Sequence, residues 1–311
     1  MNSLYINSIF ESKGWLTSMC GDNWEIITVK KNNGEIAAAL PIYYTKKFGC
    51  KLATVPPLSQ TCGLYIERTG AKLSKQLEKE KKYIVEIIDR LPKNYSYDLY
   101  LDANNEYVLP FLWKGFKVVP RFSYRIEKLD DLDVVWAGFK ENIRTDIRKA
   151  EKKVKVVESE NIDILIKMLN ETFKRQNRKS PYDENIIKKL DTFLKKEKAC
   201  KLLYAIDDDE NIHAATYFVY DEKRCYYLMS GGDPLYRNSG ATALLVWEGI
   251  KFASKHSELF DFEGSMIEDI ERFVRGFGAK PQVYYNVRKL KPLLRMAEGI
   301  KPTIKKLLHY K

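Results

Sequence analysis

Apolar residues in the first part of the chain follow the two periods that distinguish strands from helices. Residues 24–29 and 36–44 alternate or run apolar and are rich in β-branched and aromatic types, on either side of Asn32-Asn33-Gly34. This pattern predicts a β-hairpin that turns at the Asn-Gly pair. The further elements expected are a helix over 72–91 that stops before Pro92, and strands over 97–101 and 116–125.

The second part of the chain shows the same kinds of pattern in a similar order. Strands 201–206 and 213–219 flank an acidic turn at 207–211, and a third strand follows at 224–229. After a Gly-Gly-Asp-Pro turn, the remaining elements expected are a strongly apolar helix over 241–255 and strands over 259–262 and 283–288.

The repeated order of elements predicts a duplicated α+β architecture. At 311 residues the chain is long for a single hydrophobic core. We expect two tandem domains with mixed, largely antiparallel sheets. The boundaries predicted are 1–122 for the first domain, 123–287 for the second, and 288–311 for a helical tail packed back on the first domain.

Composition excludes several classes of protein and favours an anionic partner. With 45% hydrophobic and 31% charged residues, the chain can bury a core and is not disordered by composition. Five cysteines without a C-x-x-C pair indicate reduced thiols, and no apolar run is long enough for a membrane span, so a cytoplasmic location is expected. Three scattered histidines argue against a zinc site, and no metal is expected. The net charge of +11 favours phosphates, nucleic acid or an acidic membrane face.

Much of this charge lies at the C-terminus. Between Arg288 and Lys311 there are eight basic residues and one acid, Glu298, and the apolar residues recur at helical spacing. Such a segment is typical of a helix that lies on an anionic bilayer, near a lipid-linked substrate. The alternative, which we favour, is a terminal helix docked on its own domain with solvated lysines.

A second basic block covers residues 138–156. Arg144 and Arg148 lie four residues apart, so on a helix they share a face where two guanidinium groups could bind a diphosphate. The alternative is an ordinary exposed helix.

The segment 236–242, Tyr-Arg-Asn-Ser-Gly-Ala-Thr, leads from a Gly-rich turn into the helix 241–255. The first turn of a helix offers unpaired N–H groups and the positive end of the dipole, so a pyrophosphate could bind there. The candidate binding residues are Arg237, Asn238, Ser239, Gly240 and Ala241. A simple helix cap by Ser239 is the alternative. The segment lacks the endings of a Walker loop and of a dinucleotide-binding loop.

This turn resembles the R/Q-x-x-G-x-G/A turn of GNAT acyltransferases, in which backbone amides hold the coenzyme A pyrophosphate. Arg237 and Gly240 match that motif, whereas Thr242 stands where glycine or alanine is usual. The resemblance implies acyl-CoA as a donor.

Three further stretches resemble the FemAB-like branch of the GNAT superfamily, which includes the peptidoglycan-bridge aminoacyltransferases. They are the C-terminal stretch 260–287, the basic helix 143–154 and the loop 55–63. Two features depart from the family. Val274 occupies a position where lysine is common, and residues 161–198 are too few for the long helical arm of the enzymes that use aminoacyl-tRNA.

Amide formation requires a neutral amine, a group that accepts its proton and donors for the oxyanion. Glu263 follows a predicted buried strand and could accept that proton, and Asp261 lies two residues before it on the same strand face. The alternative role for Glu263 is structural, as a cap for Ser265 or nearby backbone N–H groups.

The residues expected to bind the acceptor are Arg144, Arg148, Tyr227, Arg275 and Gln60. The resemblance implies phosphate contact for Arg144. Because Tyr226 and Tyr227 lie on opposite faces of one strand, only one of them can face a cleft.

The resemblance implies an N-acyltransferase that joins an acyl or aminoacyl group to an amine on a cell-wall or surface-glycan precursor. The donor is aminoacyl-tRNA in one hypothesis. In a second it is acyl-CoA, with an amino sugar or another small amine as acceptor. A third hypothesis is a non-catalytic basic protein that binds nucleic acid or membrane. The expected partners are a phosphate-bearing small molecule or a lipid-linked glycan as acceptor, tRNA, and a membrane surface contacted through 288–311.

Overall fold

The computed structural model describes residues 8–175, 180, 182–264 and 266–298, and the chain divides into two compact units. The first unit comprises residues 1–121 and 283–311, and the second comprises 122–282. The chain crosses this division within β6 (Lys117–Ile126) and again within β12 (Lys280–Lys289). Every helix in the described residues is too short or too polar to span a lipid bilayer.

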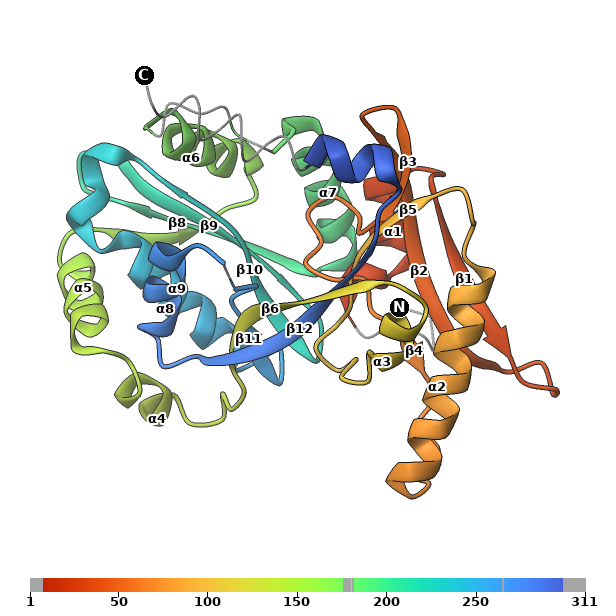
Figure 1. Ribbon diagram of the computed structural model, residues 1–311. Coiled ribbons are helices and arrows are strands. Elements are labelled where there is room, and N and C mark those ends of the chain that lie inside the picture. The colour runs from red at the N-terminus through yellow and green to blue at the C-terminus, as the bar shows by residue number, and fades with distance from the viewer. Residues whose placement is uncertain (1–7, 176–179, 181, 265, 299–311) are drawn as a thin grey trace. The chain divides into compact units, whose positions relative to one another are not determined.

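The first unit contains a mixed sheet with helices (Figure 1). Its strands are β1 (Trp24–Lys30), β2 (Ile36–Lys47), β3 (Cys50–Thr54), β4 (Tyr65–Ile66), β5 (Ser96–Tyr100) and the C-terminal part of β12. Its helices are the 3₁₀ helix Ile9–Glu11, α1 (Lys13–Cys20), α2 (Leu73–Arg90) and α3 (Leu109–Trp113). Strands follow the order β1-β2-β3-β5-β12, with β4 beside β2, and only the β3–β5 pair is parallel among these described pairs.

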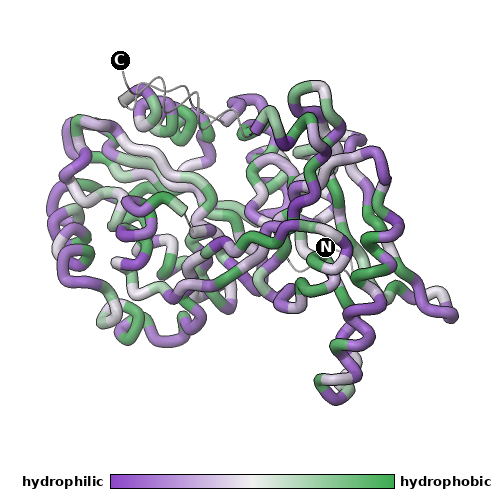
Figure 2. The backbone as a smooth tube through the Cα atoms, in the orientation of Figure 1, coloured by the Kyte–Doolittle hydropathy of each residue, from purple (hydrophilic) through white to green (hydrophobic). Residues whose placement is uncertain are grey.

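The predicted hairpin is confirmed and pairs Trp24 with Tyr43 and Val29 with Ala38. At its turn, Gly34 adopts φ 86°, a left-handed value that glycine adopts without strain. The predicted helix 72–91 is α2, which buries Ile84, Ile87 and Ile88. Hydrophilic and hydrophobic residues alternate along α2, as expected for a helix with one apolar side (Figure 2).

The second unit contains a sheet in the order β6-β11-β10-β9-β8-β7. Its further strands are β7 (Lys155–Glu158), β8 (Cys200–Ile206), β9 (Ile212–Tyr220), β10 (Arg224–Gly232) and β11 (Leu259–Asp261). Its helices are α4 (Leu132–Ala137), α5 (Glu141–Glu151), α6 (Ile162–Arg175), α7 (Glu184–Glu197), the 3₁₀ segment Pro234–Ser239, α8 (Ala241–Ala253) and α9 (Glu268–Arg275).

Within this sheet β10 pairs in parallel with β11, and the other described pairs are antiparallel. The predicted α+β class with mixed, largely antiparallel sheets is therefore confirmed. The core of the second unit gathers around α8, where Leu245, Val246 and Ile250 are fully buried against the sheet. The continuous apolar character of α8 follows from this burial, because a helix enclosed on most sides needs no polar face.

The C-terminal segment begins with the end of β12, and residues 292–298 are helical. Glu298 forms ion pairs with Lys47 and with Arg288, each at 2.6 Å, and Leu294 is fully buried. These contacts all lie within the first unit. The rest of the basic segment, 299–311, lies outside the described residues.

Candidate active site

Two candidate elements of the site follow neighbouring parallel strands in the second unit. Strand β11 ends at Asp261 and leads into Glu263, whereas β10 ends at Gly232 and leads into the 234–240 turn. Because β10 and β11 run parallel, the segments that follow them both leave the sheet at the C-terminal ends of the strands. Asp261 pairs with Tyr226, so β10 extends six residues beyond this register to Gly232. At about 3.3 Å per residue, the turn begins roughly 20 Å further along β10 than Asp261.

Glu263 is held in an unusual backbone conformation directly after β11. Its φ is 56° and that of Gly264 is 62°, so two successive residues are left-handed. A Cβ at Gly264 would lie 2.1 Å from the carbonyl oxygen of Phe122, which leaves room for glycine alone. A left-handed non-glycine residue is sparsely populated and often marks a functional site, because surrounding contacts must maintain it.

The Glu263 carboxyl group is suited to proton transfer. Its Oε1 is buried, although the residue as a whole keeps partial exposure. Burial raises the pKa of the Glu263 carboxyl well above its usual range, and the negative charge of Asp261 raises it further. A carboxyl group with a raised pKa can take up and release a proton nearer neutral pH, which is what a general base requires.

Asp261 has a different environment from Glu263. It is fully buried and accepts hydrogen bonds from Arg125 Nε at 2.7 Å, from the Glu263 backbone N–H at 2.8 Å and from the Ser123 hydroxyl. These three donors come from β6 and from the turn after β11, so Asp261 fastens the turn that carries Glu263. Its role as a second catalytic carboxylate stays a prediction, and its contacts are those of a positioning residue.

Tyr182 lies near Glu263, and Tyr227 lies near Tyr182. Burial and the charge of Glu263 raise the pKa of the Tyr182 hydroxyl. Burial raises the pKa of Tyr227 to about 12, with a smaller opposing effect from its hydrogen bond to Ser230 and a smaller contribution from Tyr182. Both hydroxyls therefore remain protonated at neutral pH and can donate hydrogen bonds. Tyr226, the neighbour of Tyr227, is fully buried.

Tyr182 is absent from the sequence-based site because it lies 81 positions from Glu263 in a loop without a recognisable motif. It immediately precedes α7, whose first turn is capped by the Asp183 side chain through the N–H groups of Asn185 and Ile186. Its ring packs edge-on against Phe173 of α6, at 5.9 Å between centroids. The Asp183 cap was the local signal for the start of a helix, but only the tertiary fold brings Tyr182 to Glu263.

The candidate phosphate residues form the 234–240 turn and the start of α8. Arg237 and Asn238 are exposed, and the buried Ser239 accepts a hydrogen bond from the Ala241 N–H at 3.2 Å. The residue in the N-cap position of α8 is Gly240, which has no side chain to cap the helix, and Ser239 precedes it. The next N–H groups of α8, from Thr242 and Ala243, are first-turn groups without partners inside the helix. They and the Arg237 guanidinium are the donors that this turn could offer to an anion.

Gly240 is required by packing against α5. Its φ is 83°, and a Cβ would lie 2.1 Å from the carbonyl oxygen of Asp146. Lys149 of the same helix donates a hydrogen bond to the Asn238 carbonyl oxygen. Helix α5 therefore holds one side of the turn.

Strand β9 contacts the turn as well, and α6 contacts Gly232 just before it. The ring of Tyr236 stacks on His213 with 4.0 Å between centroids and 6° between planes. His213 Nε2 lies 3.0 Å from Asp207 Oδ2, and the His213 carbonyl accepts the Asp233 N–H at 3.0 Å. The Thr172 hydroxyl bridges the N–H and carbonyl of Gly232, at 2.9 and 3.2 Å. The turn is thus pre-organised, which lowers the entropy lost when a ligand binds.

The basic helix predicted from sequence is α5, and it brings Arg144 and Arg148 together as expected. Both guanidinium groups contact Glu141, at 2.6 Å for Arg144 and 3.5 Å for Arg148, and Arg148 also lies over the Trp136 ring. Glu141 is largely exposed, so these ion pairs are weak and could exchange for a phosphate. Phosphate binding by these two residues stays a prediction.

The two remaining candidates lie elsewhere. Arg275, at the end of α9, pairs with Glu271 at 2.7 Å, and the same oxygen of Glu271 accepts the Tyr124 hydroxyl at 2.7 Å. Gln60 belongs to the first unit, in the loop between β3 and β4, and is half-buried. Their contacts with an acceptor stay predictions.

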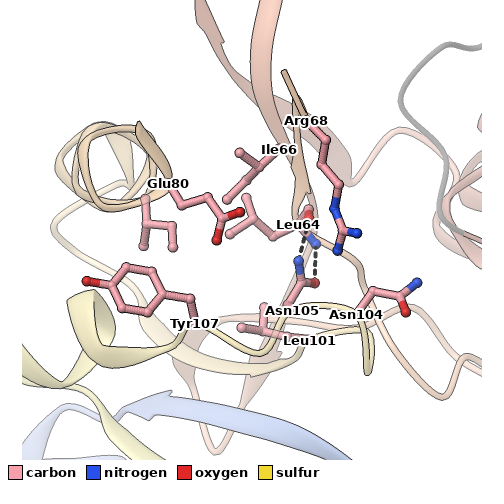
Figure 3. A pocket seen from close by; sticks show the side chains of 9 residues that line it. Leu64, Ile66, Arg68, Glu80, Leu101, Asn104, Asn105 and Tyr107 are labelled. Carbon is pink, nitrogen blue, oxygen red and sulfur yellow. Dashed lines mark hydrogen bonds between the residues drawn. The ribbon is translucent and has the colours of Figure 1, made fainter. Parts of the chain in front are cut away.

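The first unit also contains a small polar hollow of about 60 Å³ (Figure 3). The Arg68 guanidinium and the Glu80 carboxylate lie on two of its sides. Asn105, which also lines the hollow, accepts a hydrogen bond from the Leu64 N–H at 3.0 Å and donates one to the Leu64 carbonyl oxygen at 2.6 Å. None of the residues singled out from the sequence lines this hollow.

Comparison with known proteins identifies the domain that carries Glu263 and the turn. Residues 137–265 match the family described as acetyltransferase (GNAT) domain. The search of the curated proteins found no match.

Solved structures share the fold at low identity. A crystal structure of FemX is 13% identical with a TM-score of 0.67, covering 93% of this chain and 94% of that one. L-PGS from Bacillus licheniformis is 11% identical with a TM-score of 0.53, covering 88% and 87%. A tandem GNAT protein from the clavulanic acid biosynthesis pathway is 9% identical with a TM-score of 0.50, covering 86% and 83%.

The resemblance to the GNAT superfamily is confirmed for residues 137–265 by the matched domain, and the chain shares its fold with FemX. The hypothesis of a non-catalytic basic protein gives way to that of an enzyme. Residues 137–265 therefore form a domain of the GNAT acetyltransferase type, which indicates an acyltransferase.

Proposed function

We propose that the chain transfers an acyl group from acyl-CoA to a primary amine and so forms an amide. The observation that carries this proposal is the placement of two features at one edge of the second unit's sheet. One is Glu263, with its raised pKa, and the other is a pre-organised turn with Arg237 and the first N–H groups of α8. The separation along β10 suits a donor whose phosphates lie far from its reactive carbonyl.

In this proposal the 234–240 turn binds the donor pyrophosphate. The N–H groups of Thr242 and Ala243 supply hydrogen bonds, and the exposed Arg237 supplies positive charge. Thr242 replaces the usual small residue of the GNAT turn, but a side chain at the second helical position can point away from the N–H groups. The buried supports of the turn keep its donors aimed at one place.

Glu263 acts as the general base. The amine nitrogen attacks the thioester carbonyl carbon while the Glu263 carboxylate takes a proton from that nitrogen, directly or through water. The tetrahedral intermediate then breaks its C–S bond, and the departing thiolate takes up a proton. Tyr182 or Tyr227 is suited to supply that proton, since both hydroxyls stay protonated at neutral pH. Asp261 keeps the turn of Glu263 in place.

For the acceptor, we propose an amine on a phosphate-bearing sugar, such as a nucleotide-linked or lipid-linked cell-envelope precursor. Arg144 and Arg148 share one face of α5, and their only acidic contact among the described residues is the exposed Glu141. Two guanidinium groups in this arrangement match the geometry of a diphosphate. The resemblance of residues 55–63, 143–154 and 260–287 to the FemAB-like branch, which includes the peptidoglycan-bridge aminoacyltransferases, is in keeping with an acceptor of the cell envelope.

Aminoacyl-tRNA is the second candidate donor. The observation in its favour is the charge of the first unit, which holds 25 basic and 13 acidic residues and could attract a polyanion. Against it, α6 and α7 have 14 residues each and provide no long arm. We place the reaction in the cytoplasm, in keeping with five free cysteines.

The proposal is tested by incubating the full chain with acetyl-CoA, longer acyl-CoAs and aminoacyl-tRNA, with amino-sugar nucleotides as acceptors. We expect amide product, detected by mass spectrometry, with an acyl-CoA donor. The variant Arg237→Ala should raise the donor KM and leave the acceptor KM unchanged. The matched control is Arg272→Ala, because Arg272 is also exposed and pairs only with the neighbouring Asp269 among the described contacts.

Two results would contradict the proposal. Product formed only from aminoacyl-tRNA would replace acyl-CoA by the second donor. A thermal-shift series without a response to any acyl-CoA, together with unchanged kinetics in Arg237→Ala, would remove the turn as the donor site.

A further inference from the structure

Helix α3 presents an apolar face to solvent in the first unit. Leu109, Leu112 and Trp113 are 45%, 45% and 58% exposed. Their spacing of three and four residues puts them on one side of the helix. The intervening Pro110 and Phe111 are buried in the core of the unit. We call Leu109, Leu112 and Trp113 the α3 face.

An exposed apolar face of this kind is uncommon on a protein whose surface contacts only water. Single exposed apolar residues are normal, whereas a tryptophan and two leucines on one turn form a patch that usually marks an interaction site. The buried Phe111 packs edge-on against Phe116, with 5.5 Å between ring centroids, so the helix is anchored from below. The exposure of the α3 face is therefore fixed by the fold.

Three lysines lie close to the Trp113 end of the α3 face. Lys81 Nζ lies 5.1 Å from the centroid of the Trp113 ring, and Lys289 Nζ donates to the Lys114 carbonyl oxygen at 2.8 Å. Lys114 itself pairs with Asp89 at 2.7 Å, which is the acidic contact of this group. Two of these three ammonium groups thus lie beside the α3 face without an ion pair among the described residues.

The charge of the two units differs strongly. The first unit holds 25 basic and 13 acidic residues, a net +12, whereas the second holds 28 and 29, a net −1. Of the +12, residues 299–311 contribute +4, so the described part of the first unit still carries +8. The whole excess positive charge of the chain is therefore carried by the unit that exposes the α3 face, and a second copy of this unit would be repelled from it.

We propose that the α3 face binds an anionic phospholipid bilayer. Trp113 and the two leucines enter the boundary between headgroups and acyl chains, and Lys81, Lys114 and Lys289 lie at the level of the lipid phosphates. Tryptophan is suited to this boundary because its ring is apolar and its N–H can still reach water, and lysine keeps its ammonium group in the headgroup layer. This interaction is independent of the proposed reaction and of residues 299–311.

The test measures binding of the full chain to vesicles of phosphatidylcholine with and without phosphatidylglycerol. We expect binding to the anionic vesicles that weakens with added salt. Replacing Leu112 and Trp113 by serine should weaken it by about tenfold or more, because two inserted apolar side chains are lost. Lys81→Ala should weaken it by about fivefold. The matched control is Leu235→Ser, since Leu235 is 85% exposed in the second unit and should leave binding unchanged.

Insertion is measured separately from adsorption. Lipids brominated in the acyl chain should quench part of the protein fluorescence, and Trp113→Phe should remove that quenched part. Circular dichroism and thermal melting of each variant confirm that it folds.

Three results would overturn the proposal. The first is unchanged vesicle binding in the Leu112 and Trp113 double variant. The second is complete loss of binding on removal of residues 299–311 with the α3 face intact, which would assign the membrane contact to the tail. The third is a change of oligomeric state in the α3 variants without a change in vesicle binding, which would make the face a protein contact.

Discussion

Replacing Glu263 by glutamine should change activity and stability in opposite directions. The substitution keeps the size and hydrogen-bonding shape of the side chain but removes its proton chemistry. If Glu263 takes the proton from the amine, kcat should fall by about 10²- to 10⁴-fold, the range for loss of a general base. In the wild type, activity should rise with pH through the raised pKa of Glu263, because only the ionised carboxylate accepts a proton. That rise should be absent from the variant.

The effect on stability follows from the same raised pKa. The pKa of Glu263 is higher in the folded chain than in the unfolded one, so folding favours the protonated form. The stability of the wild type is complete at a pH below the unfolded pKa and declines as the pH rises through the folded pKa. Each pKa unit by which Glu263 differs between the folded and the unfolded chain changes the free energy of unfolding by about 1.4 kcal/mol at alkaline pH. Because glutamine does not ionise, the variant should unfold at a higher temperature than the wild type in alkaline buffer, by about 2–4 °C per kcal/mol.

The assay therefore combines pH–rate profiles with melting curves from acid to alkaline pH. The control is Glu258→Gln, an exposed residue just before the opposite end of β11, which should move neither measurement. A fall in kcat of less than about tenfold would remove Glu263 as the base. Equal melting temperatures at alkaline pH would show that its carboxyl group is not buried as described.

Three further predictions concern the residues that support the site. Asp261→Asn should lower the free energy of unfolding by about 3–5 kcal/mol in chemical denaturation, because the buried Arg125 loses its charged partner. The control, Asp269→Asn, breaks an exposed ion pair and should lower the free energy of unfolding by less than about 1 kcal/mol. Similar losses in both variants would contradict the prediction. Gly240→Ala should lower the free energy of unfolding by about 2–4 kcal/mol and raise the donor KM, because the new Cβ would meet the Asp146 carbonyl and the φ angle is left-handed. Gly34 also has a left-handed φ but has open space around it, so Gly34→Ala should lower the free energy of unfolding by about 1–2 kcal/mol and leave the donor KM unchanged. Tyr236→Ala should raise the donor KM by about 2- to 10-fold with little change in kcat, because the stack that holds the turn on His213 is lost, whereas Tyr236→Phe should restore it. A KM that responds equally to both Tyr236 variants would show that the stack does not position the turn.

Most of the regular elements could be predicted from the sequence. The hairpin, α2, β5, β6, the three strands β8–β10 and α8 agree with their predicted ranges to within a few residues. Each of these has a strong local signal, such as the Asn-Gly turn, the stop at Pro92 or the uninterrupted apolar run of α8. Short or amphipathic elements without such a signal, including α3, α4 and β7, were not predicted.

The candidate site was predictable only in part. Glu263, the 234–240 turn and the basic helix α5 stand out because each belongs to a compact motif. Tyr182 has no such motif, because it is far from Glu263 in sequence. The stack of His213 on Tyr236 has none either, because a complete strand separates the two residues in sequence. The different environments of Asp261 and Glu263 were equally hidden, because both are carboxylates two residues apart on one segment.

Most regular elements, the positions of the charged segments and the family resemblance can be predicted from the sequence, because periodicity, turn residues and short motifs are local properties of the chain. Three features depend on the folded chain. Asp261 pairs with Arg125 whereas the pKa of Glu263 is raised, Tyr182 lies near Glu263, and the apolar face of α3 is exposed. The physical reason is that burial and proximity between residues far apart in sequence set desolvation and electrostatic interaction, and neither quantity exists until the chain has folded.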